Sequence, residues 1–193
     1  MRRELQRLAA AAVLDFSKNY FELFELPVGF ALDAKRLAEG YRTLQTATHP
    51  DRFAVAADHE KRWSLQASTQ VNEAYRTLKD PLARAKYLLA LHTGDPGTTS
   101  ETSKDGAFLM EQMELRETLA EAQTSPNPQA AVARVLTQLA EQSVALDKEL
   151  EGLFATPSPA NLETAREVVR KLQFMDKCRR DAEALESAID GRY

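Results

Sequence analysis

The chain has 193 residues, a net charge of −4, a hydrophobic fraction of 44% and a charged fraction of 28%. A net negative chain argues against nucleic acid as the main partner, because phosphate neutralisation needs a basic surface. The single cysteine, Cys178, excludes an intramolecular disulfide and a zinc site built from several thiolates, and it favours a reducing compartment.

Few glycines and long runs of good helix formers predict an all-α protein. Residues 20–93 are close to neutral, with ten Lys/Arg and nine Asp/Glu, whereas residues 94–193 carry a net charge of −7. Two parts of different polarity suggest two surfaces for two partners. No apolar run approaches the length needed to span a bilayer.

The segment 1–19 places three arginines ahead of a short apolar run, as some targeting segments do. Glu4, Asp15 and the shortness of the run instead favour a short extra helix that leads into the first domain.

Two helices are predicted next. Asn19 caps a short helix that continues through Leu26 and is ended by Pro27. Asp33 caps a second helix, on which one apolar stripe recurs at helical spacing. The members of this stripe are Leu37, Tyr41, Leu44 and Thr48.

The second helix is interrupted at His49-Pro50-Asp51. Pro50 cannot continue a helix and biases His49 away from the helical region. Since another amphipathic helix follows, from about Ala57 to Lys79, the tripeptide is predicted at the tip of a helix-loop-helix hairpin. An ordinary turn with an aspartate helix cap is the simplest interpretation of these three residues.

A fourth helix is predicted from Pro81 to His92, and Gly94 ends it. The composition of 94–104 is that of a linker, so we place a domain boundary there. The expected organisation is an N-terminal extension (1–19), a first domain (20–93), the linker (94–104) and a C-terminal domain (105–193).

The C-terminal domain is predicted to be a bundle of three antiparallel helices joined by proline-bearing turns. Its last two helices run from about Pro128 to Phe154 and from about Ala160 to Ile189. The first shows the apolar residues Val132, Val135, Leu136, Leu139, Val144, Leu146 and Leu150, and the second shows Val168, Leu172, Met175, Ala182 and Ile189 on one side.

The helix predicted from Gly106 to Glu121 has two different apolar faces. Phe108, Leu115 and Leu119 are enough to dock it on the other two helices. The opposite face combines Leu109, Met110 and Met113 with Glu114, Glu117 and Glu121. Exposed Leu and Met beside carboxylates predict a partner site, unless the fourth helix or the linker covers them.

Three segments together resemble the J-domain family: an aromatic-acidic first helix, the His-Pro-Asp turn, and a characteristic end of the third helix. In this chain they read Asn19-Tyr20-Phe21-Glu22-Leu23-Phe24-Glu25-Leu26-Pro27, His49-Pro50-Asp51, and Val71-Asn72-Glu73-Ala74-Tyr75-Arg76-Thr77-Leu78-Lys79-Asp80-Pro81.

Further motifs narrow the resemblance to the HscB family, the iron–sulfur cluster co-chaperones. They are Pro81-Leu82-x-Arg84-Ala85-x-Tyr87-Leu88-Leu89-x-Leu91-His92, Ala107-Phe108-Leu109-Met110-Glu111-Gln112, Glu114-Leu115-Arg116-Glu117 and Val169-Arg170-Lys171-Leu172-x-Phe174-x-Asp176-Lys177. The resemblance runs from about Tyr20 to the last helix. It implies a co-chaperone without an active site, cofactor or metal, which stimulates a DnaK-type ATPase (HscA) and brings it the scaffold protein IscU.

Carried over by motif, the resemblance implies two sets of contact residues. The chaperone contacts are His49, Pro50 and Asp51, supported by Lys35, Arg36, Arg42 and Arg52. The scaffold contacts are Leu109, Met110, Met113, Glu114, Glu117, Glu121 and Phe174.

The chain departs from the family pattern at several places. Thr46 and Thr48 replace residues that are often basic or aromatic, which suggests a lower chaperone affinity. The cysteine-rich module of some eukaryotic relatives is absent, which favours a bacterial-type, cytoplasmic protein without zinc. The segment before Tyr20 has no counterpart in the bacterial pattern.

Two other functions are compatible with parts of the sequence. A general J-domain protein that presents unfolded clients would show a broad apolar groove or a glycine-rich or cysteine-rich segment. A hydrolase could use His49 and Asp51 as an acid–base pair, but no nucleophile motif or phosphate loop accompanies them. Lys177 and Arg179 could lower the pKa of Cys178, although a plain helix cysteine is the simpler interpretation.

Overall fold

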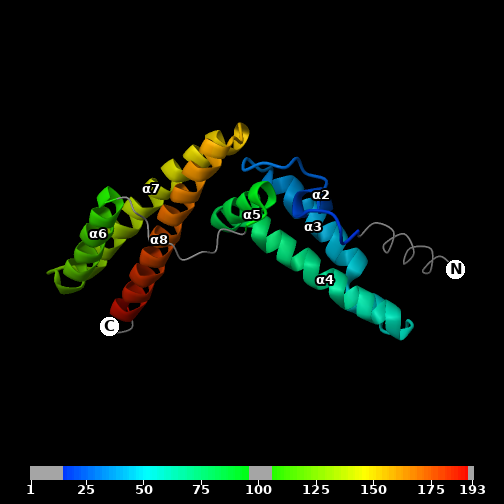
Figure 1. Cartoon of the computed structure of the whole chain (residues 1–193). Coiled ribbons are helices and arrows are strands. Elements are labelled where there is room, and N and C mark those ends of the chain that lie inside the picture. The colour runs from blue at the N-terminus through cyan, green and yellow to red at the C-terminus, as the bar shows by residue number, and fades with distance from the viewer. Residues whose placement is uncertain (1–14, 96–105, 191–193) are drawn as a thin grey trace. The chain divides into compact units, whose positions relative to one another are not determined.

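A computed structural model describes residues 15–95 and 106–190, and all regular structure in these ranges is helical (Figure 1), which confirms the predicted all-α class. The elements are α2 (Tyr20–Leu23), α3 (Ala34–Thr48), the 3₁₀-helix η1 (Pro50–Phe53), α4 (Asp58–Lys79), α5 (Pro81–Thr93), α6 (Gly106–Thr124), α7 (Pro128–Ala155) and α8 (Pro159–Asp190). None of these helices combines the length and the apolar character needed to cross a bilayer.

The chain divides into two compact units between Tyr87 and Leu88. The division falls inside α5, several residues before the start of the predicted linker. Most of that linker, and most of the predicted N-terminal extension, lie outside the described residues, so both remain predictions.

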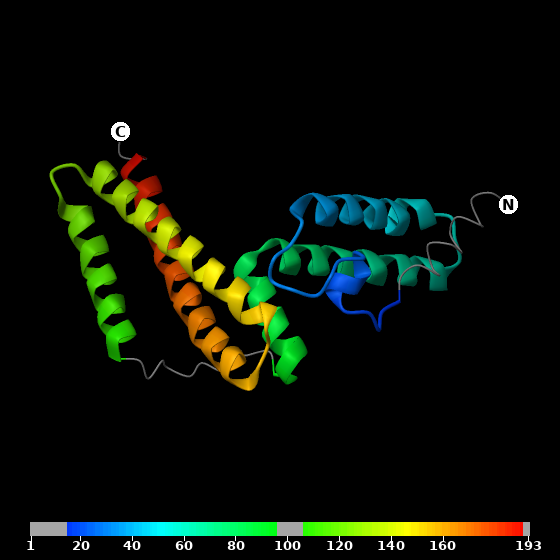
Figure 2. The same ribbon diagram turned by 90° about the horizontal axis from the view of Figure 1, so that it is seen from above.

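The first unit is organised around the antiparallel pair α3 and α4, which lie side by side in Figure 2. Tyr41 of α3 stacks on Tyr75 of α4, with ring centroids 4.0 Å apart, and its hydroxyl donates to Asn72 Oδ1 at 2.9 Å. Ala74, which is fully buried, lies between Asn72 and Tyr75 in sequence. The Asn72-Glu73-Ala74-Tyr75 motif therefore holds the two helices of the hairpin together.

The first helix is shorter than predicted, because α2 ends at Leu23 rather than Leu26. Glu25 takes a left-handed conformation, with φ 54°, and the Leu26 amide donates back to the Phe21 carbonyl at 2.9 Å. This turn closes the helix early and brings Leu26 into the core, where it is 6% exposed. The predicted Asn19 cap is confirmed, since its side chain accepts from the Phe21 and Glu22 amides.

Tyr87 anchors the α2 region within the same unit. Its ring stacks on Tyr20 with centroids 4.4 Å apart, and its hydroxyl accepts a bond from the Tyr20 amide at 2.9 Å. Burial, together with the neighbouring Glu73, raises the pKa of Tyr20 to about 12.

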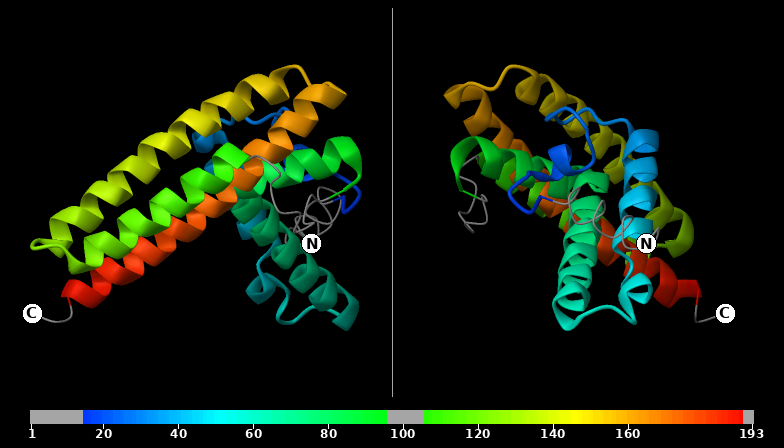
Figure 3. Two further views of the ribbon diagram at one scale, coloured as in Figure 1. Left: turned by 60° about the vertical axis from the view of Figure 1, so that its left-hand side comes forward. Right: turned by 90° about the vertical axis from the view of Figure 1, so that its right-hand side faces the viewer.

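The second unit contains a bundle of α6, α7 and α8, as predicted (Figure 3). Helices α7 and α8 are antiparallel and share the longest interface, and α6 packs against both. The five apolar residues predicted to share one side of α8 are all buried. Among the apolar residues of α7, Val144 is 68% exposed. Val144 follows the buried Val135 by nine residues, which places it on the opposite side of the helix, about 180° away.

Candidate functional site

The His49-Pro50-Asp51 turn links α3 to η1 and is exposed at all three residues. His49 lies at the end of α3 and at the start of η1, and its Nδ1 accepts a hydrogen bond from the Asp51 amide at 3.3 Å. The Asp51 carboxylate is 91% exposed, and its Oδ2 lies 3.6 Å from the same Nδ1. The helix cap is thus His49, not aspartate as the simplest interpretation of the turn had it.

Pro50 removes one backbone hydrogen-bond donor from the end of α3. The Thr46 carbonyl would normally accept from the amide four residues on, but that residue is Pro50, which has no N–H. The Arg52 guanidinium replaces the missing donor, with Nη1 3.0 Å from the Thr46 oxygen. After the turn, Phe53 is 2% exposed and packs on Trp63, with ring centroids 5.7 Å apart. The turn is therefore fixed on both sides.

The predicted basic face of α3 is exposed, but its members are not equivalent. Lys35, Arg42 and His49 are spaced by seven residues, close to two helical turns, so they form one stripe that leads to the turn. Arg36 lies about 100° away from this stripe. Its Nη2 donates to the Glu25 carbonyl at 3.1 Å, which supports the left-handed turn after α2.

In the second unit, α6 has the two faces that the sequence predicts. Phe108 is 4% exposed, and Leu115 and Leu119 pack against the bundle core. Leu109, Met110 and Met113 are 39%, 65% and 61% exposed. Within the second unit, α7 and α8 leave these three side chains exposed, and most of the linker, which the sequence offered as a possible cover, lies outside the described residues. We name this side of the helix the α6 outer face and define it as Leu109, Met110, Met113, Glu114, Glu117 and Glu121, all of which are exposed.

The charge along the α6 outer face is polarised. Its apolar members occupy the first part of the helix and the three glutamates follow towards the C-terminal end, over about 18 Å. Phe174 of α8, the remaining predicted scaffold contact, touches α6 at other residues. Its half-buried ring meets Phe108 edge-on at 5.8 Å, and the Arg116 guanidinium lies 5.5 Å from its centre. Phe174 is therefore part of the docking contact of α6 as well as a predicted scaffold contact.

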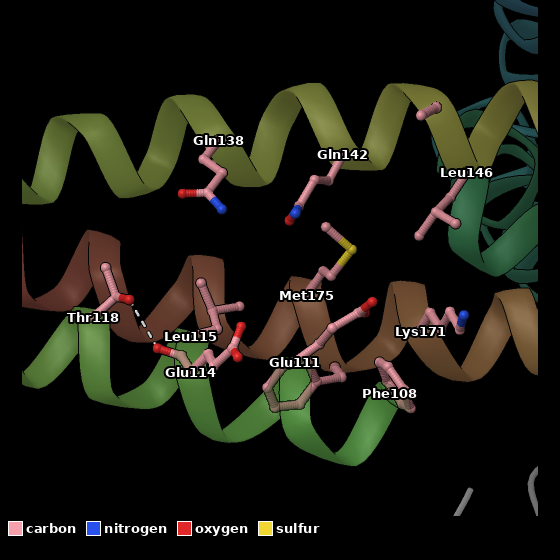
Figure 4. Close-up of a pocket in the computed structure, with 12 residues that line it drawn as sticks. Phe108, Glu111, Glu114, Leu115, Thr118, Gln138, Gln142, Leu146, Lys171 and Met175 are labelled. Atoms are coloured by element: carbon pink, nitrogen blue, oxygen red, sulfur yellow. Dashed lines mark hydrogen bonds between the residues drawn. The ribbon is translucent and has the colours of Figure 1, made fainter. Parts of the chain in front are cut away.

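A cavity of about 370 Å³ lies between α6 and α7, and its lining includes Phe174 and Glu114, the latter a member of the α6 outer face. Figure 4 shows Gln138 and Gln142 pointing down into it from α7, opposite Glu111 and Leu115 of α6. Met175 and Lys171 of α8 form its floor. Sequence reasoning did not identify this cavity, because the glutamines of α7 look like ordinary surface positions.

Cys178 is buried in α8 and behaves as a core residue. Burial is the main cause that raises the pKa of its thiol, and Asp181 adds to the effect. The neighbouring charge of Lys177, which was expected to lower this pKa, is outweighed. The simpler interpretation of a plain helix cysteine is the one that the structure favours.

Comparisons with known proteins agree over most of the chain. Residues 104–183 match the family model described as the HSCB C-terminal oligomerisation domain. The co-chaperone protein HscB homolog of Shewanella woodyi is 40% identical over 171 residues, which cover 89% of this chain and 98% of the relative. The solved structure of chaperone HscB from Vibrio cholerae is 39% identical, has a TM-score of 0.78, and is matched over 89% of this chain and 99% of its own. Human co-chaperone protein HscB is 29% identical, with a TM-score of 0.77 over 89% of this chain and 83% of its own.

A helical hairpin with a His-Pro-Asp turn at its tip, joined to a three-helix unit, defines a J-domain protein with a C-terminal helical domain. The identity to full-length relatives and the match of the C-terminal model narrow this class further. The chain belongs to the HscB family of co-chaperones.

Proposed function

We propose that this chain stimulates the ATPase of a DnaK-type chaperone, HscA, and delivers to it the iron–sulfur scaffold protein IscU. The observation that supports this most strongly is the presence of two different exposed surfaces on two compact units. One is a rigidly held His-Pro-Asp turn, and the other is an apolar and acidic helix face that α7 and α8 leave exposed.

The turn is suited to bias a partner's conformation. His49, Pro50 and Asp51 would contact the chaperone, with Lys35 and Arg42 extending the contact along the stripe on α3. Arg36 and Arg52 add positive charge nearby, while each also donates to a backbone carbonyl of its own chain. An acidic partner surface would meet this stripe by electrostatic complementarity. Stimulation then requires only that the turn bind the hydrolysis-competent state more tightly than the other state.

The α6 outer face is suited to a folded partner with an apolar patch next to basic groups. Methionines adapt to the shape of a partner, and the glutamates attract positive charge and help set the register. Phe174 of α8 would complete the scaffold site. Because both surfaces belong to one chain, each bound partner raises the effective concentration of the other.

In this proposal the chain has no active site, and its work takes place in the bacterial cytoplasm. Its contacts with the two partners act through binding free energy, and the chain itself makes or breaks no covalent bond. Bacterial relatives and a lone buried thiol are consistent with a reducing compartment.

Replacing His49 by Gln tests the division of labour between the units. His49→Gln should abolish stimulation of the chaperone ATPase while the affinity for the scaffold, measured by calorimetry, stays within about twofold of the original. A matched control is His59→Gln, since His59 is an exposed histidine of α4 outside both surfaces. Normal stimulation by His49→Gln would refute the role given to the turn.

A further inference from the structure

Thr48 and Ser64 are the buried polar side chains of the described residues, and they meet directly behind the His49-Pro50-Asp51 turn. Thr48, the last residue of α3, is 1% exposed, and Ser64 of α4 is 0% exposed. The Ser64 hydroxyl donates to the Thr48 carbonyl at 2.7 Å. The Ser68 hydroxyl, one turn further along α4, donates to the same oxygen at 2.8 Å.

The Thr48 carbonyl depends on these two donors. The amide four residues on belongs to Arg52, which donates instead to the His49 carbonyl at 3.0 Å. The hydroxyl of Thr48 itself is used within α3, where it donates to the Leu44 carbonyl at 2.9 Å. A buried carbonyl needs a hydrogen-bond partner, so α4 supplies what the interrupted helix cannot.

These bonds act on the turn because of the geometry of one peptide group. The carbonyl of Thr48 and the amide of His49 lie in one rigid plane. Two hydrogen bonds that hold the oxygen in place therefore fix the orientation of the chain as it enters His49. From there the His49 ring reaches the Asp51 amide, so the imidazole position depends on the same anchor.

We propose that Ser64 and Ser68 are positioning residues for the chaperone-contacting turn. Their hydroxyls hold the Thr48–His49 peptide group against α4, and so present His49, Pro50 and Asp51 in one orientation. The proposal rests on the proposed function, since its consequence is measured as chaperone stimulation. It assigns a role to two serines that are not among the proposed contact residues.

Ser64 and Ser68 donate to the same carbonyl oxygen, so the test compares the two single substitutions with the double substitution. A carbonyl oxygen accepts two hydrogen bonds, so Ser64→Ala or Ser68→Ala alone leaves one donor in place, and serine-to-alanine changes hardly alter packing. Each single variant should shift the concentration for half-maximal stimulation by less than about twofold, and the double variant by about tenfold. Such a strongly non-additive pair is expected only if both hydroxyls serve one acceptor.

Two control variants separate positioning from general stability. Val71→Ala removes a fully buried side chain from α4 and lowers the melting temperature without touching the turn. Thr48→Val removes the Thr48 hydroxyl but keeps its carbonyl. Both should stimulate normally at a temperature at which circular dichroism shows every variant folded. Hydrogen exchange of the Arg52 amide, which needs no chaperone, should accelerate in the double serine variant and not in Val71→Ala.

The outcomes distinguish the two proposals. Suppose that the unaltered chain stimulates the chaperone and His49→Gln does not. Full stimulation by the double serine variant then overturns the positioning role and leaves the proposed function standing. Additive effects of the two serines that scale with melting temperature overturn the positioning role as well. No stimulation by the unaltered chain overturns the proposed function, while faster Arg52 exchange in the double serine variant would still support the anchoring of the turn.

Discussion

The His49-Pro50-Asp51 turn and the α6 outer face present their proposed contact groups in different ways. The turn is held by hydrogen bonds from outside itself, to the Thr46 and Thr48 carbonyls, and its three residues have one defined backbone path. The α6 outer face lies on an uninterrupted helix, and its apolar side chains are exposed. The first surface is preorganised by backbone, whereas the second is adaptable through Met and Leu side chains.

This difference predicts how each surface responds to substitution. Substitutions that alter the backbone path of the turn, but keep the side chains of His49 and Asp51, should abolish chaperone stimulation. Changes of side-chain polarity should disable the α6 outer face and leave its helix intact.

Pro50→Ala should have the largest effect. Alanine supplies an amide that can donate to the Thr46 carbonyl, so α3 can continue past His49 and the turn loses its path. We expect chaperone stimulation to fall by about tenfold or more, with no loss of thermal stability, in parallel ATPase and melting measurements.

Pro81→Ala is the matched control for this change. Pro81 occupies the first position of α5, where a missing N–H is harmless, so stimulation should be unchanged. If Pro50→Ala stimulates as well as Pro81→Ala, the turn does not act through a fixed backbone.

Met110→Asp should have the next largest effect, on the other surface. Met110 is 65% exposed, so the substitution should leave folding intact, but it removes apolar contact and adds charge to an already acidic face. We expect scaffold affinity to fall roughly tenfold to a hundredfold, by the free energy of burying a methionine side chain. Calorimetric titration with the scaffold measures it.

Val144→Asp provides the comparison for Met110→Asp, since Val144 is 68% exposed on α7, outside the α6 outer face. It should bind the scaffold normally. Equal losses in the two variants would mean that net charge, rather than a defined site, governs the affinity.

Arg52→Lys should have a smaller effect on the turn. Lysine keeps the positive charge but lacks the planar guanidinium that reaches the Thr46 carbonyl. We expect stimulation to fall about threefold, and this loss should persist when salt is raised, because an intramolecular hydrogen bond is less screened than a surface charge. Full activity of Arg52→Lys would show that Arg52 acts through its charge alone.

The smallest effect concerns the interior beneath the α6 outer face. Burial raises the pKa of Cys178 above its ordinary value of 9.0, so the folded state keeps a proton that the unfolded state loses. The thiol therefore contributes stability that is fully present below the unfolded pKa and is lost as pH rises through the folded pKa. Melting curves in the alkaline range should fall more steeply with pH for the unaltered chain than for Cys178→Ala. Equal slopes would contradict this origin of the pH dependence.

The sequence predicted the parts of the molecule that depend on helical periodicity. The buried stripe of α8 and the two faces of α6 follow from spacing alone, because a regular helix fixes which residues share a side. Val144 shows that apolar character alone does not identify a core position, because its spacing from Val135 places it on the opposite side of α7. The end of α2 was missed because nothing local identifies Glu25 as the residue with a left-handed conformation.

The anchors of the turn could not be predicted in the same way. Ser64 and Ser68 are four residues apart on a helix and look like polar surface positions. Their role depends on which carbonyl of a distant helix end approaches them, and that is a tertiary fact. Arg52 illustrates the same limit, since its charge was visible in the sequence and its bond to Thr46 was not.

The most direct test of the two-surface co-chaperone is the steady-state ATPase rate of the DnaK-type chaperone HscA. It should be measured alone, with this chain, with the scaffold IscU, and with both. We predict that the rate with both exceeds the sum of the rates with either alone, and that Met110→Asp removes this excess while keeping the stimulation by the chain itself. Full stimulation by the chain with no further increase from the scaffold would contradict the delivery role.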